Sequence, residues 1–192
     1  DVRWFAPKIG AGALAFSPTS NSDACFIQSS SMGVDYGGDF TIELWFKSTG
    51  SDSSTPYLFD PRTSSVAAGL YCFINESTGK LYVNDMNTSI NENQWYHVAM
   101  VGDGSTLRAY LDGTQFDTDT NTGTLIPTVF TLGSRNATGA GETDTYFDGY
   151  MDEVRISNFA RYPDGTPFTP SPTGFTDDIN TALLIHGDSV QG

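Results

Sequence analysis

The chain has 192 residues, a length that suits one domain with a substantial buried core. Nine Lys and Arg against 23 Asp and Glu give a formal net charge of −14, which argues against nucleic acid and anionic membrane surfaces as partners. Asp, Gly, Ser and Thr are abundant, which is typical of strands and turns, and no apolar run is long enough to span a membrane.

Short apolar segments alternate with clusters of Gly, Asn, Asp, Ser and Pro, and this pattern predicts strands. The clearest strand is 40–47, in which apolar side chains occupy one face and Thr, Glu, Trp and Lys the other. In chain order, the predicted strands cover residues 13–16, 25–28, 40–47, 70–75, 80–83, 95–101, 107–113, 129–133, 146–157 and 181–188. An extended, proline-rich strap is predicted over 160–172. Because no segment shows a helical period, we expect an all-β fold with two antiparallel sheets packed as a sandwich.

The two cysteines, Cys25 and Cys72, both lie in apolar, strand-like segments. Two cysteines are too few for a disulfide scaffold. Two buried free thiols and a single bridge are both compatible with the sequence.

Four segments carry a family resemblance: GDFTIELWFK (38–47), NQWYHVAMVGDGSTLRAYLDGTQ (93–115), LGSRN…YFDGYMDEVRISNFARY (132–162) and FTPSPTGF (168–175). Together they resemble the concanavalin A-like lectin/glucanase superfamily. More narrowly, they resemble the laminin-G-like jelly-roll modules of phage tail-fibre, virion and extracellular adhesion proteins. The resemblance implies a jelly-roll domain over residues 1–175.

Modules of this family usually open with an LLLH(G/F)DG-like strand, which this sequence lacks at its N-terminal side. A similar segment, LLIHGD, stands at 183–188 instead. Residues 176–192 are therefore expected either to complete the sheet, in this chain or in a neighbour, or to begin a next module.

Asp152 is the best candidate for a metal ligand. Strand alternation places it on the same face as Val154 and Ile156, which should face the core, and a buried carboxylate needs compensation. Oxygen-liganded Ca²⁺ would supply it, and so would backbone N–H donors. The resemblance implies a structural Ca²⁺ held by an Asp at this strand and by a backbone carbonyl near Gly38. Asp23 is a further candidate in either arrangement.

The strand faces that point away from the predicted core carry aromatic and charged side chains. The predicted ligand-binding residues are Trp45, Tyr71, Tyr82, Arg108, Tyr110 and Arg155. The resemblance implies that such a face binds glycans, because aromatic rings stack on sugar C–H groups and charged side chains bind hydroxyls. Alternatively, loops cover this face, Trp45 and Phe73 form a minor core and Arg155 pairs with Glu43. The predicted loops 51–57 and 134–146 are other contact sites, with Tyr57 and Tyr146 as stacking residues.

Catalysis is not expected. His97 and His186 have no third ligand at zinc spacing. The glucanases of the family carry an E-x-D-x-x-E pattern or a close variant, and none of the five glutamates lies in one.

The sequence therefore predicts a non-catalytic surface module for glycan recognition or adhesion, located outside cells or on a virion, such as a phage tail fibre. An alternative is a structural assembly protein that packs against neighbouring subunits, as a homo-oligomer or in a multi-module assembly. A glycoside hydrolase is a third reading, because the fold also hosts such enzymes.

Overall fold

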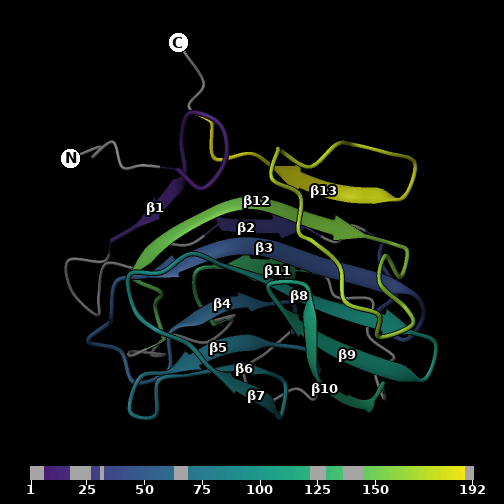
Figure 1. Cartoon of the computed structure of the whole chain (residues 1–192), viewed down its shortest axis with the longest axis horizontal. Coiled ribbons are helices and arrows are strands. Elements are labelled where there is room, and N and C mark those ends of the chain that lie inside the picture. Colours follow the sequence, from purple (N-terminus) through teal and green to yellow (C-terminus); the bar gives the residue numbers. More distant parts are fainter. Residues whose placement is uncertain are drawn as a thin grey trace.

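The secondary structure consists of strands alone in the part of the chain that the computed structural model describes, which is residues 7–17, 27–30, 33–62, 69–121, 129–135 and 145–188. These residues include no helix, and hence none that could cross a membrane. The strands form two antiparallel sheets that pack face to face (Figure 1). The predicted all-β sandwich is confirmed.

The larger sheet, called sheet A here, contains the most deeply buried strands. Its order is β1 (Leu14–Phe16), β12 (Gly149–Ser157), β3 (Phe40–Ser48), β8 (Tyr96–Asp103), β9 (Thr106–Leu111) and β10 (Thr114–Thr120), and β13 (Thr181–Ile185) also pairs with β12. Sheet B has the order β2 (Ile27–Ser30), β11 (Val129–Leu132), β4 (Tyr57–Asp60), β5 (Cys72–Asn75), β6 (Lys80–Val83) and β7 (Met86–Ser89).

The main core lies between the sheets and follows the predicted alternation. Phe40, Ile42, Leu44 and Phe46 of β3 are fully buried in it. Cys72 is a free thiol in the same core, and burial raises its pKa well above the usual value. Cys25 lies outside the described residues.

A β-bulge in β12 changes which face Asp152 occupies. The register with β3 pairs Asp152 with Trp45 but then pairs Arg155 with Glu43, and Glu153 at the bulge has a φ of 51°. The side chains of two residues paired on adjacent strands point to the same side of the sheet. Asp152 therefore lies beside Trp45 on the outer face of sheet A. The prediction that Asp152 shares the core face with Val154 is wrong, because the extra residue of the bulge reverses the alternation.

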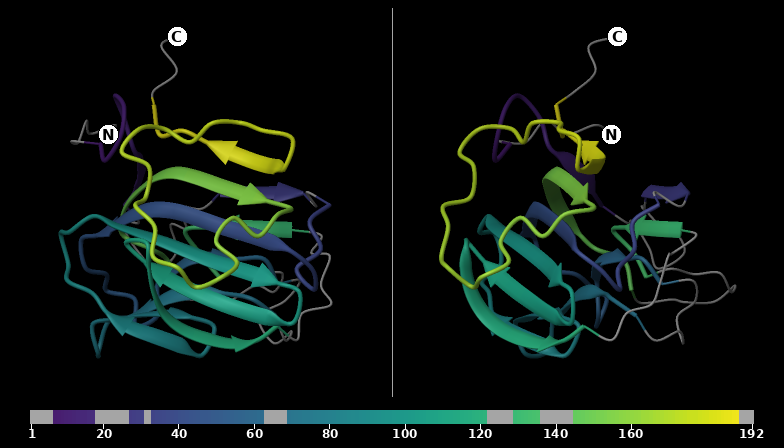
Figure 2. Two further views of the ribbon diagram at one scale, coloured as in Figure 1. Left: turned by 45° about the vertical axis from the view of Figure 1, so that its right-hand side comes forward. Right: turned by 90° about the vertical axis from the view of Figure 1, so that its right-hand side faces the viewer.

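One edge of β12 is shared by two short strands. β1 pairs with the first part of β12 and β13 with the last part, both antiparallel, so they run in the same direction one after the other. Where they meet, Asp188 accepts the N–H of Ala11 (2.6 Å), and Asp152 accepts those of Ile9 (3.0 Å) and Gly187 (3.2 Å). The segments before β1 and after β13 therefore lie side by side (Figures 1 and 2).

Gly102 is expected to tolerate no side chain. A Cβ built there would lie 2.2 Å from a ring carbon of the fully buried Phe40, so Gly102→Ala should lower the free energy of unfolding by about 2 kcal/mol. Gly38→Ala is the matched control, because the nearest atom to its Cβ would be 3.7 Å away. Urea denaturation of both variants measures the difference, and equal stability would contradict the packing.

Candidate functional site

The outer face of sheet A is covered by the segment 158–175, which we call the strap (Figure 2). Phe168 and Phe175 place ring edges against His97, at centroid distances of 5.9 and 6.0 Å. The Tyr110 hydroxyl donates to the carbonyl of Tyr162 at 2.6 Å, and the Tyr162 ring stacks on Phe168. These contacts form a second, smaller core on the outside of the sheet.

A buried carboxylate lies beneath the strap. Glu43 Oε1 accepts hydrogen bonds from Arg155 Nη2 (2.6 Å) and Nε (2.8 Å), and Oε2 accepts one from the Tyr162 hydroxyl (3.0 Å). His97 Nε2 lies 3.2 Å from Oε2. Burial acts to raise the pKa of Glu43, but the hydrogen bonds and charges of His97 and Arg155 outweigh it and leave that pKa below its usual value. Glu43 is therefore ionised at neutral pH and ties the strap to β3, β8 and β12.

The six predicted ligand-binding residues do not form one site. Trp45 is 7% exposed and has the Lys8 ammonium 4.1 Å above its ring, and Tyr110 is fully buried. Arg155 is held by Glu43. Arg108 pairs with Asp103 at 3.4 Å. The covered face and the Arg155–Glu43 pair of the alternative are observed in sheet A, but its minor core of Trp45 and Phe73 is not, because Phe73 lies in sheet B.

Of the other two predicted residues, Tyr82 lies in β6 of sheet B and Tyr71 immediately precedes β5, on the opposite side of the sandwich. The same side of sheet B carries Tyr57 and Phe73. Strand register places Tyr57 opposite Phe73, and Phe73 opposite Tyr82. Tyr71, Phe73 and Tyr82 are only half-buried. The aromatic surface of this fold therefore lies on sheet B.

Tyr57, Phe73 and Tyr82 form what we call the aromatic stack. The ring centroids of Tyr57 and Phe73 are 5.3 Å apart, and the two ring planes form an angle of 25°. Those of Phe73 and Tyr82 are 4.9 Å apart, with an angle of 9°. If the rings lay side by side in one plane, their centroids would be more than about 6 Å apart, because carbon atoms of the two rings approach no closer than about 3.5 Å. The rings therefore overlap face to face. Tyr82 ends the stack, and its second face contacts no other ring among the described residues.

Polar groups lie beside Tyr82 at the free end of the stack, and another lies beside Tyr71, close to its other end. Asn87 is in register with Tyr82, and the Lys80 ammonium donates to its amide oxygen at 3.0 Å. The Tyr71 hydroxyl donates to Asp85 at 3.1 Å, and burial together with this carboxylate raises the pKa of Tyr71 to about 12. The Tyr82 ring, with an amide and an ammonium beside it, can pack against the C–H face of a sugar and bind its hydroxyls.

The far end of the stack is closed by an ion pair. Arg62 binds both carboxylate oxygens of Asp60 at 2.8 Å, and its guanidinium carbon lies 4.7 Å from the centre of the Tyr71 ring and 5.6 Å from that of Tyr57. Arg62 and Asp60 are both buried. They support the aromatic rings rather than offering groups to a ligand.

Sequence reasoning missed Lys80 and Asn87, although a signal for both was present. Alternation in KLYV puts Lys80 on the same face as Tyr82. Asn84 and Asp85 between two strands form a two-residue hairpin turn, with Asn84 at a φ of 51°, and this turn sets the register that brings Asn87 opposite Tyr82.

The residues predicted to bind calcium are not brought together. Asp152 is in register with Trp45, seven residues along β3 from Gly38, which is about 20 Å of strand. Both Asp152 oxygens already accept backbone N–H groups, and burial raises its pKa. Asp23 lies outside the described residues. In the described ranges, no three His, Cys, Asp or Glu side chains could hold a metal ion together. These residues do not fit a shared site, and calcium binding stays a prediction.

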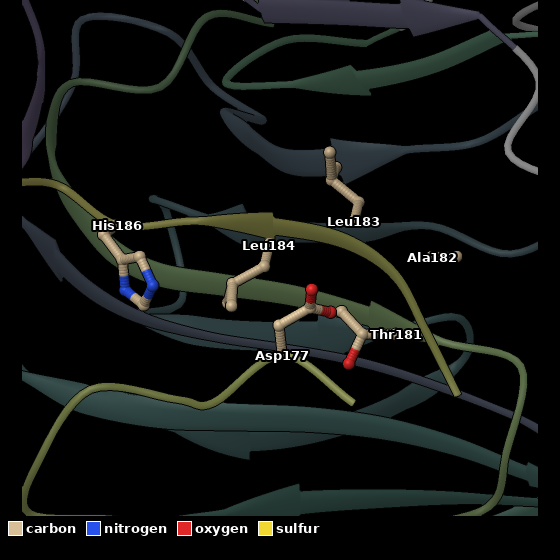
Figure 3. Close-up of a pocket in the computed structure, with 6 residues that line it drawn as sticks. All are labelled: Asp177, Thr181, Ala182, Leu183, Leu184 and His186. Atoms are coloured by element: carbon tan, nitrogen blue, oxygen red, sulfur yellow. The ribbon is translucent and has the colours of Figure 1, made fainter. Parts of the chain in front are cut away.

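A hollow of about 430 Å³ lies beside β13 (Figure 3). It is lined by Asp177, Thr181, Ala182, Leu183, Leu184 and His186. His186 Nδ1 is 2.7 Å from the buried Glu153 carboxylate, whose other oxygen accepts the N–H of Phe175 in the strap. These contacts join the end of β13 to both the bulge and the strap.

Comparison with known proteins supplies a family and several related folds. A family model described as the concanavalin A-like lectin/glucanases superfamily matches residues 19–164. The chain is similar to the native heptameric SAP-like pentraxin from Limulus polyphemus, with 17% identity, a TM-score of 0.61, and coverage of 91% of this chain and 94% of that one. No curated protein sequence matches the chain.

Two further solved structures share the fold. A Bacteroides ovatus protein described as "a putative carbohydrate binding protein" has 18% identity and a TM-score of 0.61, with coverage of 91% of this chain and 50% of that one. Domains LG4-5 of the mouse laminin alpha1 chain have 16% identity and a TM-score of 0.57, with coverage of 84% of this chain and 47% of that one. The chain thus spans about half the length of these two.

Glu43→Gln should destabilise the fold in a pH-dependent way. The change leaves Arg155 buried without its counter-charge, which at pH 7 should lower the free energy of unfolding by about 3 kcal/mol. Because the pKa of Glu43 is lowered by folding, its ionised form stabilises the protein above the usual pKa of 4.5, and this contribution is lost as the pH falls below that value. The difference between wild type and variant should therefore shrink toward pH 3.

Urea denaturation between pH 3 and pH 7 measures this difference. Glu92→Gln is the matched control, since Glu92 is exposed and forms no ion pair with a described residue. A Glu43→Gln penalty that stays constant over this pH range would disprove the assigned role of the carboxylate.

Proposed function

The chain belongs to the concanavalin A-like lectin/glucanases superfamily, and from this premise we propose that it is a non-catalytic module that binds glycans on the outer face of sheet B. The observation that carries the proposal is the contrast between the two outer faces. The strap closes the face of sheet A, whereas sheet B presents half-exposed aromatic rings with polar groups beside them. The carbohydrate-binding description of the Bacteroides ovatus protein supports the same function.

The carboxylates near the stack favour binding over hydrolysis. Glycosidases use two carboxyl groups on either side of the scissile bond. Of the described carboxylates near the aromatic stack, Asp60 is held by Arg62 and Asp85 accepts the Tyr71 hydroxyl. This arrangement provides no acid and nucleophile pair across a sugar on Tyr82.

Assembly with neighbouring subunits is a second candidate function. β13 pairs with β12 alone among the described strands, and the hollow of Figure 3 lies beside it. A sheet edge with unpaired backbone groups is a ready template for a strand of another chain. Light scattering after size-exclusion chromatography tests this candidate: a stable oligomer supports it, and a monomer at high concentration excludes self-assembly. Location outside cells or on a virion stays a prediction.

Tyr82→Ala should weaken glycan binding by about tenfold. The substitution removes the last ring of the stack and with it the aromatic surface that attracts and packs against the C–H groups of a sugar. A glycan array followed by titration of the best ligand measures the change. Tyr150→Ala is the matched control, a half-exposed tyrosine on the outer face of sheet A. If both variants bind as well as wild type, sheet B is not the binding face.

A further inference from the structure

Charge is unevenly divided between the two sheets. The strands of sheet A carry twice as many carboxylates as cations. The carboxylates are Glu43, Asp103, Asp117, Asp119, Asp152 and Glu153, and the cations are Lys47, Arg108 and Arg155. The strands of sheet B carry Asp60 and Lys80 alone. Counted over Asp, Glu, Lys and Arg, the strands of sheet B therefore carry no net charge, whereas those of sheet A carry a net charge of −3.

The cation of sheet B is not neutralised by its neighbours. Asp60 forms its ion pair with Arg62, not with Lys80. The Lys80 ammonium donates to the neutral amide of Asn87 and forms no ion pair with a described residue. The Lys80 ammonium is therefore a positive charge on the outer face of sheet B that no described carboxylate pairs with.

Lys80 is also close to the ring that a sugar can reach. It precedes Tyr82 by two residues on β6, so the two side chains project from the same face of the sheet. Asn87, which is opposite Tyr82 on β7, accepts the Lys80 hydrogen bond and holds the ammonium beside the free end of the stack. An anionic substituent on a sugar packed against Tyr82 would lie within reach of this ammonium.

We propose that the ligand of sheet B is an acidic glycan, in which a sugar ring packs against Tyr82 and its carboxylate or sulfate group pairs with Lys80. The inference rests on the proposed function and specifies its ligand class. A neutral sugar would need hydrogen-bond donors here but no fixed positive charge, whereas an ammonium that is paired with no described carboxylate favours an anionic substituent.

A glycan array with neutral, carboxylated and sulfated saccharides tests the proposal, with polygalacturonate, dextran sulfate and dextran titrated in solution as representative polymers. Wild-type protein should bind at least one acidic class at least tenfold more tightly than its neutral counterpart. Raising the salt concentration from 50 to 500 mM should weaken that binding severalfold. The carboxylated and sulfated arms distinguish the two possible anionic groups.

Lys80→Gln is the decisive variant: it should lower affinity for the acidic ligand about tenfold and affinity for neutral saccharides by a clearly smaller factor, because the glutamine amide can still donate to a sugar hydroxyl. Lys80→Arg should retain most of the binding, because it keeps the charge. Lys47→Gln is the matched control: it removes the same charge from the outer face of sheet A, where Lys47 lies over Tyr150. Thermal melts of all three variants confirm that each is folded.

The possible outcomes separate the ligand class from the function. Preference for neutral saccharides, or equal losses for Lys80→Gln and Lys47→Gln, would overturn the acidic-glycan proposal while leaving glycan binding by sheet B intact. If no saccharide of any class binds, the proposed function fails together with its ligand class.

Discussion

The ion pair of Glu43 with Arg155 is the interaction on which the outer side of sheet A depends. One fully buried carboxylate joins two neighbouring strands, a histidine on a third and a tyrosine of the strap. Burying a carboxylate costs free energy unless both of its oxygens are hydrogen-bonded or ion-paired. This arrangement therefore tolerates little displacement of the strap. The phenylalanine rings of the strap then exclude water from the network, which strengthens its hydrogen bonds. The strap is thus a fixed part of the fold.

Covering one face of the sandwich leaves the other to make contact with a ligand. The two outer faces use similar residue types, yet they differ in what those residues touch. On sheet A, tyrosine and arginine side chains bind other parts of the same chain. On sheet B, the ion pair of Arg62 with Asp60 closes one end of the aromatic stack, and the other end stops at a half-exposed tyrosine. A row of overlapping rings is rigid, so little side-chain entropy would be lost when a ligand packs against the last one.

The architecture followed from the sequence, because apolar alternation and turn residues are local signals. The strand at 40–47, the strap and the hairpins β5–β6 and β8–β9 were predictable in this way, whereas β7 and β10, which are short or polar, were not predicted. The positions of the site residues were not. Assigning Asp152 to the core failed at a bulge, where Glu153 bonds the strap and His186, and these long-range contacts leave no trace in the local alternation. Grouping Trp45 with Tyr82 failed because alternation identifies the two faces of a strand but not the sheet to which the strand belongs.

The shared edge of β12 has a mechanical consequence. Ile9 and Ala11 are bonded to the same junction as Gly187 and Asp188, and the two short strands continue one another along a single ladder. Tension applied between these two segments would load the few hydrogen bonds at the bulge and then peel β13 from β12 one pair at a time. The sheet-to-sheet core, and with it the aromatic stack on the far side, would carry little of that load. A ligand held on sheet B would thus be insulated from strain that enters along this edge.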